Sequence, residues 1–436
     1  MPSDDLRLKA DPAKLSLPHR ARLVAGTVAG DLAATASRLL GKGSGASIRG
    51  QILTRIAPDA FGDLVKGRRI VAVSGTNGKT TTTHFVASAL REALGPDAGR
   101  LVHNADGANL HYGIASALAK APRADVAVLE TDERVVADLL AKGRPEVLVL
   151  LNFSRDQLDR NHEIKFLGRD WRSALDRAGA DGPVVIANAD DPLVTWAAEK
   201  APKVVWVSTA TTWNADAAMC PACGAMLTRA SASDGTSTWD CPSCELTQHD
   251  ADYVVRDGFI RLPDGTAIDP QLNVPGVFNI ANAAMALAAV AELGVDAETA
   301  LRGFRSVKAP AGRFSVATIG GSSYRLILSK NPAGWAESLP LLTTDPCVLM
   351  IDSVAADGKD VSWLWDVEFE QLRGRRVVAS GPRAYDLAVR LTYAEVEHSV
   401  IPDLTEGLGA ATGPGTVDVI ATYTPFQKLL KMGGLR

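Results

Sequence analysis

The chain has 436 residues and a formal net charge of −4; 46% of its residues are hydrophobic and 22% are charged. Such a chain should form two or three soluble domains with full cores. Its mild acidity argues against a broad basic face for nucleic acid. No apolar run approaches the ~18 residues of a membrane span and the N-terminus is not a signal peptide, so we expect a cytoplasmic protein.

Residues 1–60 are predicted to form an N-terminal helical segment. Within it, residues 23–40 are rich in Ala and Leu and amphipathic, which suits a helix that covers a core or meets a partner. Residues 41–46 read as a flexible Gly/Ser connector. We place a central nucleotide-binding domain at residues 61–308 and a smaller domain at residues 309–436.

A glycine loop between a strand and a helix opens the central domain. An apolar strand is predicted over 70–73 and an apolar-periodic helix over 81–94. This order favours a phosphate cradle, in which Lys79 supplies charge and Thr80 a hydroxyl for Mg²⁺. Val73 stands where the usual phosphate-loop pattern has its first glycine, so an ordinary strand–helix turn stays open. The nucleotide-binding candidates are Gly75, Thr76, Asn77, Gly78, Lys79, Thr80 and Thr81.

Short apolar runs then alternate with helical patterns. Strands are expected at 126–130, 147–151, 184–187 and 204–207. Continuous apolar runs suit a parallel sheet that is covered on both faces, so we expect a doubly wound α/β domain.

Polar residues follow two of these strands. Glu130, at the end of one strand, is a candidate Mg²⁺ ligand, with capping of a helix N-terminus as the alternative. The polar turn 152–160 fits an anion site or a capping network with exposed ion pairs equally well.

Two CxxC pairs interrupt the alternation within residues 218–250. Cys220, Cys223, Cys241 and Cys244 have the spacing of a closed tetrahedral Cys₄ zinc site, which we predict to be structural. Cys347, at the start of an apolar strand, is expected to be a buried thiol. From about residue 309 a second alternation, with strands at 325–328, 348–351, 377–379 and 417–421, predicts a Rossmann-like domain.

These motifs resemble a known family. The run GTNGKT at 75–80 is similar to the phosphate loop of Mur ligases and folylpolyglutamate synthetases. GVFNIANA at 276–283 and AGRF at 311–314 resemble further Mur motifs. The Cys₄ insertion, NFSRDQLDR at 152–160, KNPAGW at 330–335 and DGKDVSWLWD at 357–366 resemble one subfamily, MurT. The chain departs from Mur ligases at Ile327, where they carry an aspartate that meets the ribose.

The resemblance implies an ATP- and Mg²⁺-dependent carbon–nitrogen ligase. Its expected reaction is amidation of the D-glutamate α-carboxylate in the lipid II stem peptide, through an acyl phosphate. Lys79, Thr80 and Glu130 would serve the phosphates and Mg²⁺, Arg313 and Lys330 the γ-phosphate, and Asn282 the adenine side.

The resemblance implies a GatD-type glutaminase as the source of ammonia, in a heterodimer with this chain. A separate glutaminase also fits the residues, because no cysteine of this chain has the context of a glutaminase nucleophile. The resemblance also implies that an aspartate of the C-terminal domain completes the partner's Cys–His pair. Asp357 and Asp360 are the favoured candidates and Asp366 is a third, with turn and N-cap duty as the alternative.

Two other functions stay open on the sequence. One is a Mur or folylpolyglutamate-type ligase that adds an amino acid and needs no partner. The other is a non-catalytic zinc scaffold with a vestigial nucleotide site, for which the missing ribose aspartate at Ile327 is the supporting feature.

Overall fold

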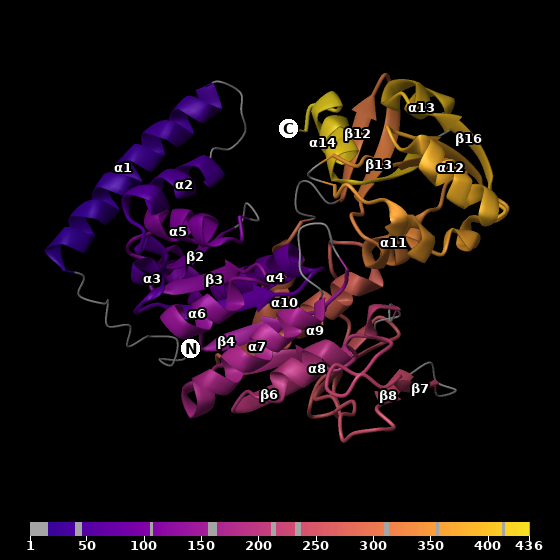
Figure 1. Cartoon of the computed structure of the whole chain (residues 1–436). Helices are drawn as coiled ribbons and strands as arrows, with labels where there is room; N and C mark the ends of the chain where they lie inside the picture. The colour runs from indigo at the N-terminus through magenta and orange to yellow at the C-terminus, as the bar shows by residue number, and fades with distance from the viewer. Residues whose placement is uncertain are drawn as a thin grey trace. The chain divides into compact units, whose positions relative to one another are not determined.

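Two compact units make up the chain, whose computed structural model is drawn in Figure 1. The first unit comprises Met1–Phe153 and Lys165–Val307, and the second comprises Ser154–Ile164 and Lys308–Arg436. The structure describes residues 16–39, 46–104, 108–155, 164–210, 215–231, 237–308, 314–354, 357–411 and 415–435. Over these ranges, no helix is both long enough and apolar enough to cross a membrane.

A mixed sheet forms the core of the first unit. Its strand order is β11-β10-β9-β6-β5-β4-β1-β3-β2, and the strands from β6 to β2 pair in parallel. Strand β1 lies between β3 and β4, so the direction of strand succession reverses beside it. Ligands of open α/β sheets bind at such a reversal, beyond the carboxyl ends of the strands. The strands are β1 (Arg69–Ser74), β2 (Leu101–His103), β3 (Val126–Glu130), β4 (Val147–Leu150), β5 (Val184–Asn188), β6 (Lys203–Ser208), β9 (Tyr253–Arg256), β10 (Phe259–Arg261) and β11 (Ala267–Ile268).

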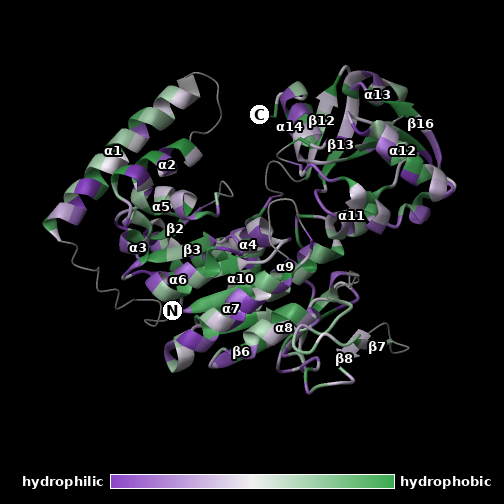
Figure 2. Ribbon diagram, viewed as in Figure 1, coloured by the Kyte–Doolittle hydropathy of each residue, from purple (hydrophilic) through white to green (hydrophobic). Residues whose placement is uncertain are grey.

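The sheet confirms the predicted α/β class and differs from the prediction at one edge. All four runs predicted as later strands are strands, and their side chains are almost entirely buried; hydrophobic colouring concentrates on this sheet in Figure 2. However, the sheet continues beyond β6 with strands that the sequence did not predict: β9 pairs in parallel with β6, and β10 and β11 follow as antiparallel strands. These short strands alternate buried and exposed positions, which is the weaker pattern of a half-covered edge.

Helices cover this sheet. The phosphate-loop helix α4 packs against α9 and α10, and α9 also packs on β4, β5 and β6. Helix α4 begins at Lys79, two residues before the predicted start, because Gly78 in a left-handed conformation turns the chain into it. The helices are α1 (Leu17–Leu39), α2 (Ala46–Ile56), α3 (Ala60–Val65), α4 (Lys79–Leu94), α5 (His111–Lys120), α6 (Val136–Gly143), α7 (Ile164–Ala178), α8 (Pro192–Ala198), α9 (Val277–Ala291) and α10 (Ala297–Ser306).

The second unit holds a six-stranded sheet in the order β12-β13-β17-β14-β15-β16, in which only the β12–β13 pair is antiparallel. Buried clusters on both faces form its core. Its strands are β12 (Phe314–Ile319), β13 (Ser322–Leu328), β14 (Cys347–Met350), β15 (Arg376–Ser380), β16 (Glu397–Ile401) and β17 (Thr416–Ala421). Its helices are α11 (Pro332–Ser338), α12 (Ala384–Tyr393), α13 (Leu404–Ala410) and α14 (Tyr423–Met432).

Asp191 joins two elements of the first unit, α8 and the end of β4. Its Oδ1 accepts the N–H groups of Leu193 and Val194 and so caps α8. Its Oδ2 accepts the N–H of Phe153, just beyond β4, at 2.7 Å. Burial raises the pKa of Asp191 from 3.8 to about 6, against the lowering effect of these three N–H donors.

This raised pKa predicts a pH dependence of stability. Between pH ~4 and ~6 the folded chain binds more protons at Asp191 than the unfolded chain, so the contribution of Asp191 to stability falls as the pH rises. A pKa change from 3.8 to about 6 corresponds to about 3 kcal/mol. We expect the free energy of unfolding of wild type, minus that of Asp191→Asn, to fall by this order between pH 4 and pH 7. Denaturant unfolding at several pH values measures it, and a difference independent of pH would contradict the assignment.

Candidate nucleotide site

Two glycines give the 75–80 loop its shape. Gly75 has φ +137° and Gly78 has φ +86°, both in the region that side chains disfavour. A Cβ on Gly75 would lie 2.9 Å from the Asn152 nitrogen, and a Cβ on Gly78 would lie 2.4 Å from the Asn282 Oδ1. Both positions therefore require glycine for conformation and for space.

Asn152, at the end of β4, holds the loop from both sides. Its Oδ1 accepts the Asn77 N–H at 2.9 Å, and its Nδ2 donates to the Asn77 carbonyl at 3.1 Å. Its own carbonyl accepts the Thr76 N–H at 2.9 Å. Because the Thr76 and Asn77 amides are engaged in this way, the candidate anion site of the loop is the N-terminus of α4, whose first N–H groups point out of the helix.

The sequence reading named Asn152 only as the start of a polar turn. The sequence feature that could have identified Asn152 is its position directly after a buried strand, beside the strand that leads into the 75–80 loop. Residues 156–160 of that turn lie outside the described ranges.

Lys79 is folded back over the loop in this structure. Its ammonium group donates to the Gly75 carbonyl and to the Thr76 carbonyl, the latter at 3.2 Å, and forms an ion pair with Glu133 at 3.3 Å. Lys79 as a whole is 9% exposed. A triphosphate would compete with the carboxylate of Glu133 for Lys79, so Glu133 is a candidate site residue that the sequence analysis did not single out.

The predicted Mg²⁺ ligands lie at the same edge of the sheet. Val73 of β1 and Glu130 of β3 are register partners, which brings the carboxyl end of β3 beside the loop. Glu130 is buried, and its Oε1 accepts from Asn109 at 3.2 Å. Thr80 lies in the first turn of α4, followed by the buried Thr81.

Asn282 reaches the loop from α9. Its Oδ1 accepts from the Thr82 hydroxyl at 3.3 Å, and its Nδ2 donates to Asn279 at 3.2 Å. Together with the close approach to Gly78, these contacts place Asn282 against the loop, and its role on the adenine side stays a prediction. Arg313, the other residue predicted at the nucleotide, lies outside the described residues.

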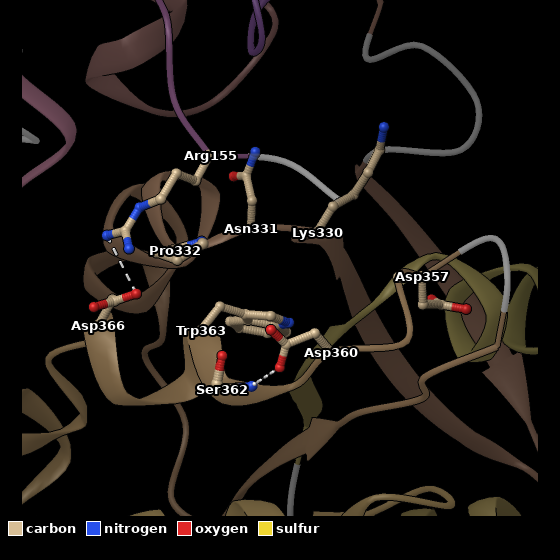
Figure 3. A pocket seen from close by; sticks show the side chains of 10 residues that line it. Arg155, Lys330, Asn331, Pro332, Asp357, Asp360, Ser362, Trp363 and Asp366 are labelled. Carbon is tan, nitrogen blue, oxygen red and sulfur yellow. Dashed lines mark hydrogen bonds and ion pairs between the residues drawn. The ribbon is translucent and has the colours of Figure 1, made fainter. Parts of the chain in front are cut away.

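A polar pocket in the second unit gathers the other predicted residues (Figure 3). In Figure 3 the Lys330 amine points away from Asp357 and Asp360. Arg155 and Asp366, which both line the pocket, form an ion pair at 3.2 Å. The pocket is lined by Arg155, Lys330, Asn331, Pro332, Asp357, Gly358, Asp360, Ser362, Trp363 and Asp366.

The two favoured aspartates differ sharply in environment. Asp357 is 5% exposed, and its Oδ1 accepts the N–H of Thr424 at the start of α14. Asp360 is exposed, and the N–H of Ser362 at 2.8 Å holds its pKa below the usual range. Asp357 is thus held to α14 through one carboxylate oxygen, while its Oδ2 is buried without a hydrogen-bond partner among the described residues. Asp360 instead presents an ionised carboxylate to solvent.

Four cysteines form the predicted cluster in the first unit. The Sγ atoms of Cys220 and Cys244 are 3.6 Å apart, those of Cys223 and Cys241 are 3.5 Å apart, and all four lie within 4.8 Å of one another. A tetrahedral site with metal–sulfur bonds of ~2.3 Å has sulfur atoms ~3.8 Å apart, so this donor set fits a metal ion such as zinc.

The cysteine module is fixed to the nucleotide-binding sheet. Trp239 of β8 (Ser237–Asp240), which pairs with β7 (Thr228–Ser231), donates to the Ala189 carbonyl at 3.0 Å. Gln248 donates to Asp190 at 2.9 Å. These acceptors immediately precede Asp191, so the module, the cap of α8 and the end of β4 form one connected set of contacts.

The remaining cysteine and the tryptophans divide between core and surface. Cys347 is fully buried, and burial raises the pKa of its thiol to about 12, which confirms the expected buried thiol. Trp335 is likewise fully buried, while Trp365 is 54% exposed and lies 5.2 Å from the ring of Tyr393.

Comparisons with known families match both units. The Mur ligase middle domain matches residues 73–290, and the MurT ligase C-terminal domain matches residues 328–426. The chain is 30% identical over 395 residues to the lipid II isoglutaminyl synthase (glutamine-hydrolyzing) subunit MurT of Staphylococcus aureus strain N315, covering 85% of this chain and 87% of that protein. The subunit of the same name from Streptococcus pneumoniae is 29% identical over 379 residues, covering 80% and 82%.

The solved structures agree in fold. A pseudomurein peptide ligase type C from Methanothermus fervidus superposes with a TM-score of 0.63 and 17% identity, covering 88% of this chain and 84% of that one. The predicted Mur-ligase-type architecture is therefore confirmed.

The loop geometry predicts a strong effect of Gly78→Ala. A Cβ there would displace Asn282 and force the loop out of its conformation, which we expect to weaken ATP binding by about 10²-fold. Isothermal titration with Mg²⁺-ATP measures this affinity. Gly95→Ala is the matched control, since Gly95 also has a positive φ but has open space around it; equal ATP affinity of the two variants would contradict the model of the loop.

Proposed function

The chain belongs to the MurT family of Mur ligases, and on that premise we propose that it is the ATP-dependent synthetase subunit of a lipid II isoglutaminyl synthase. The observation that carries the proposal is a nucleotide-binding unit with a braced phosphate loop on the same chain as a MurT C-terminal domain. The substrate is the D-glutamate α-carboxylate of the stem peptide, and the product is D-isoglutamine. The need for ATP assigns the reaction to the cytoplasmic side of the membrane.

The reaction has two steps. A carboxylate oxygen attacks the γ-phosphorus of ATP, which releases ADP and forms an acyl phosphate. Ammonia then attacks the acyl carbon, inorganic phosphate leaves, and the attacking nitrogen loses a proton. Positioning and neutralisation of phosphoryl charge account for most of the catalysis in such transfers.

The residues of the loop fit the first step. When ATP binds, the ammonium group of Lys79 leaves the carboxylate of Glu133 and pairs with the phosphates. It needs little movement to do so, because it already lies over the loop. Thr80 and Glu130 hold Mg²⁺, which neutralises phosphate charge when bound. Asn282 meets the nucleotide from α9, and Arg313 and Lys330 are assigned to the γ-phosphate by their family motifs.

Zinc is the metal we assign to the four cysteines. Four thiolates leave no open position for a substrate or water, so the ion is structural, with one zinc per chain as the expected metal content. Its role is to hold the module that contacts Ala189 and Asp190.

Ammonia comes from a GatD-type glutaminase partner. A glutaminase needs an activated nucleophile, and the buried Cys347, with its raised pKa, is unsuited to that role. The other four cysteines are assigned to zinc. The exposed, ionised Asp360 is the carboxylate best placed to orient a histidine of the partner, and we assign it that role in preference to Asp357.

An exposed aromatic surface supports a partner on the second unit. Tyr385, Val389 and Tyr393 recur every four residues along α12 and are 67%, 51% and 71% exposed. Trp365 packs against Tyr393, and the Arg390 guanidinium lies 5.7 Å from the centre of the Trp365 ring. Tyr, Trp and Arg are the residues most often found at the centres of protein interfaces.

Mass spectrometry of lipid II tests the proposal. With ATP, Mg²⁺ and a high concentration of ammonium, the purified chain should replace an OH group by NH₂ and lower the substrate mass by about one dalton. Lys79→Ala should abolish the change. Absence of the change with wild type, or addition of an amino acid without any partner, would refute the amidation.

The role of Asp360 predicts that its substitution lowers amidation with glutamine but not amidation with free ammonium. With the glutaminase partner present, Asp360→Asn should lower glutamine-dependent amidation by about 10²–10⁴-fold, the range for loss of a histidine-orienting carboxylate. Amidation with free ammonium should be unchanged. Asp366→Asn is the comparison variant, because the Asp366 carboxylate is already paired with Arg155; an equal loss in both variants would contradict the assignment.

A further inference from the structure

Helix α1 exposes a continuous apolar stripe. Leu17, Val24, Val28 and Leu32 are 82%, 63%, 55% and 69% exposed. Their spacings of seven, four and four residues place them on one face of the helix, over about four turns. Exposed leucine and valine side chains in one continuous row mark an interaction surface rather than scattered surface residues.

The opposite face of α1 fixes which way this stripe points. Gly26 and Gly30 pack directly on α2, where a Cβ would lie 3.0 Å from Leu53 and 2.8 Å from the carbonyl oxygen of Arg49, respectively. Ala34 is also buried on this face. The small residues hold α1 close to α2, so the stripe faces away from the rest of the first unit.

Positive charge flanks the stripe. Arg20 and Arg22 are both exposed and lie at its N-terminal end. The acidic Asp31 of α1 is paired with Arg49 of α2. In the sequence, residues 7–22 carry five Lys and Arg residues and one Asp, although the whole chain has a net charge of −4. Figure 2 shows both hydrophilic and hydrophobic bands along α1.

We propose that the exposed face of α1 binds the surface of an anionic lipid membrane, with the aliphatic stripe inserted at the headgroup–acyl boundary and the arginines at the phosphates. Amphipathic helices with flanking basic residues bind membranes in this way without crossing them. Helix α1 contains His19, Arg20, Arg22 and Asp31, and it does not qualify as a membrane span.

A lipid surface fits this face better than a second copy of the chain. A stable protein dimer buries about 800 Å² on each partner, more than four aliphatic side chains on one helix provide. Helix α1 precedes both regions matched by the family models. The assignment deepens the proposed function, because a lipid-linked substrate has to be met at a membrane.

Vesicle co-sedimentation tests the assignment without using the reaction. The full chain is mixed with phosphatidylcholine vesicles that contain about 30 mol% phosphatidylglycerol and no lipid II. We expect the double variant Val24→Glu/Leu32→Glu to bind about tenfold more weakly than wild type. Arg20→Glu/Arg22→Glu should lose the preference for anionic over neutral vesicles. Val316→Glu is the control, because Val316 is 57% exposed on β12 in the other unit.

Equal vesicle binding by wild type and Val24→Glu/Leu32→Glu would overturn the proposal, as would no binding by wild type. A concentration-dependent dimer in sedimentation velocity that the double variant abolishes, without vesicle binding, would identify a second copy as the occupant. Circular dichroism checks that the variants stay folded. Vesicle binding without amidation would refute only the proposed function, whereas amidation without vesicle binding would refute only the role of α1.

Discussion

The paired hydrogen bonds between Asn152 and Asn77 are the interaction on which the nucleotide site depends. They join the end of β4 to the loop that follows β1, across the point where the strand order reverses. Without these bonds, a phosphate loop with two glycines would have many accessible conformations. Ordering it when the nucleotide binds would cost conformational entropy and weaken the affinity. Because Asn152 holds Thr76 and Asn77 in place, the loop has less conformational freedom to lose if an anion binds at the N-terminus of α4.

The support for Asn152 extends away from the nucleotide. Phe153, its neighbour, is held by Asp191, and the residues just before Asp191 accept hydrogen bonds from the cysteine module. This arrangement gives a physical reason for an inserted cysteine module in a ligase. A metal ion bound to the four thiolates would fix a small module that has little hydrophobic core of its own, and the module contacts the loop on which α8 begins.

The sequence predicted the features that depend on local patterns. The buried strands, the glycine loop and the Cys₄ spacing all follow from the composition or spacing of neighbouring residues, and the structure places each where it was expected. Partners distant in sequence were not predicted. Lys79 with Glu133, and Asp191 with Phe153, are pairs that only the folded sheet brings together. The edge strands β9 to β11 were missed because two- to four-residue strands carry too little periodicity to identify.

The central claim is that this chain activates a carboxylate by phosphorylating it before ammonia attacks. Isotope transfer tests that claim most directly. Lipid II labelled with ¹⁸O in the D-glutamate α-carboxylate is incubated with ATP, Mg²⁺ and ammonium, and the inorganic phosphate is analysed by mass spectrometry. An acyl phosphate predicts one ¹⁸O atom in phosphate for each amide formed. Amide formation with unlabelled phosphate would contradict the account.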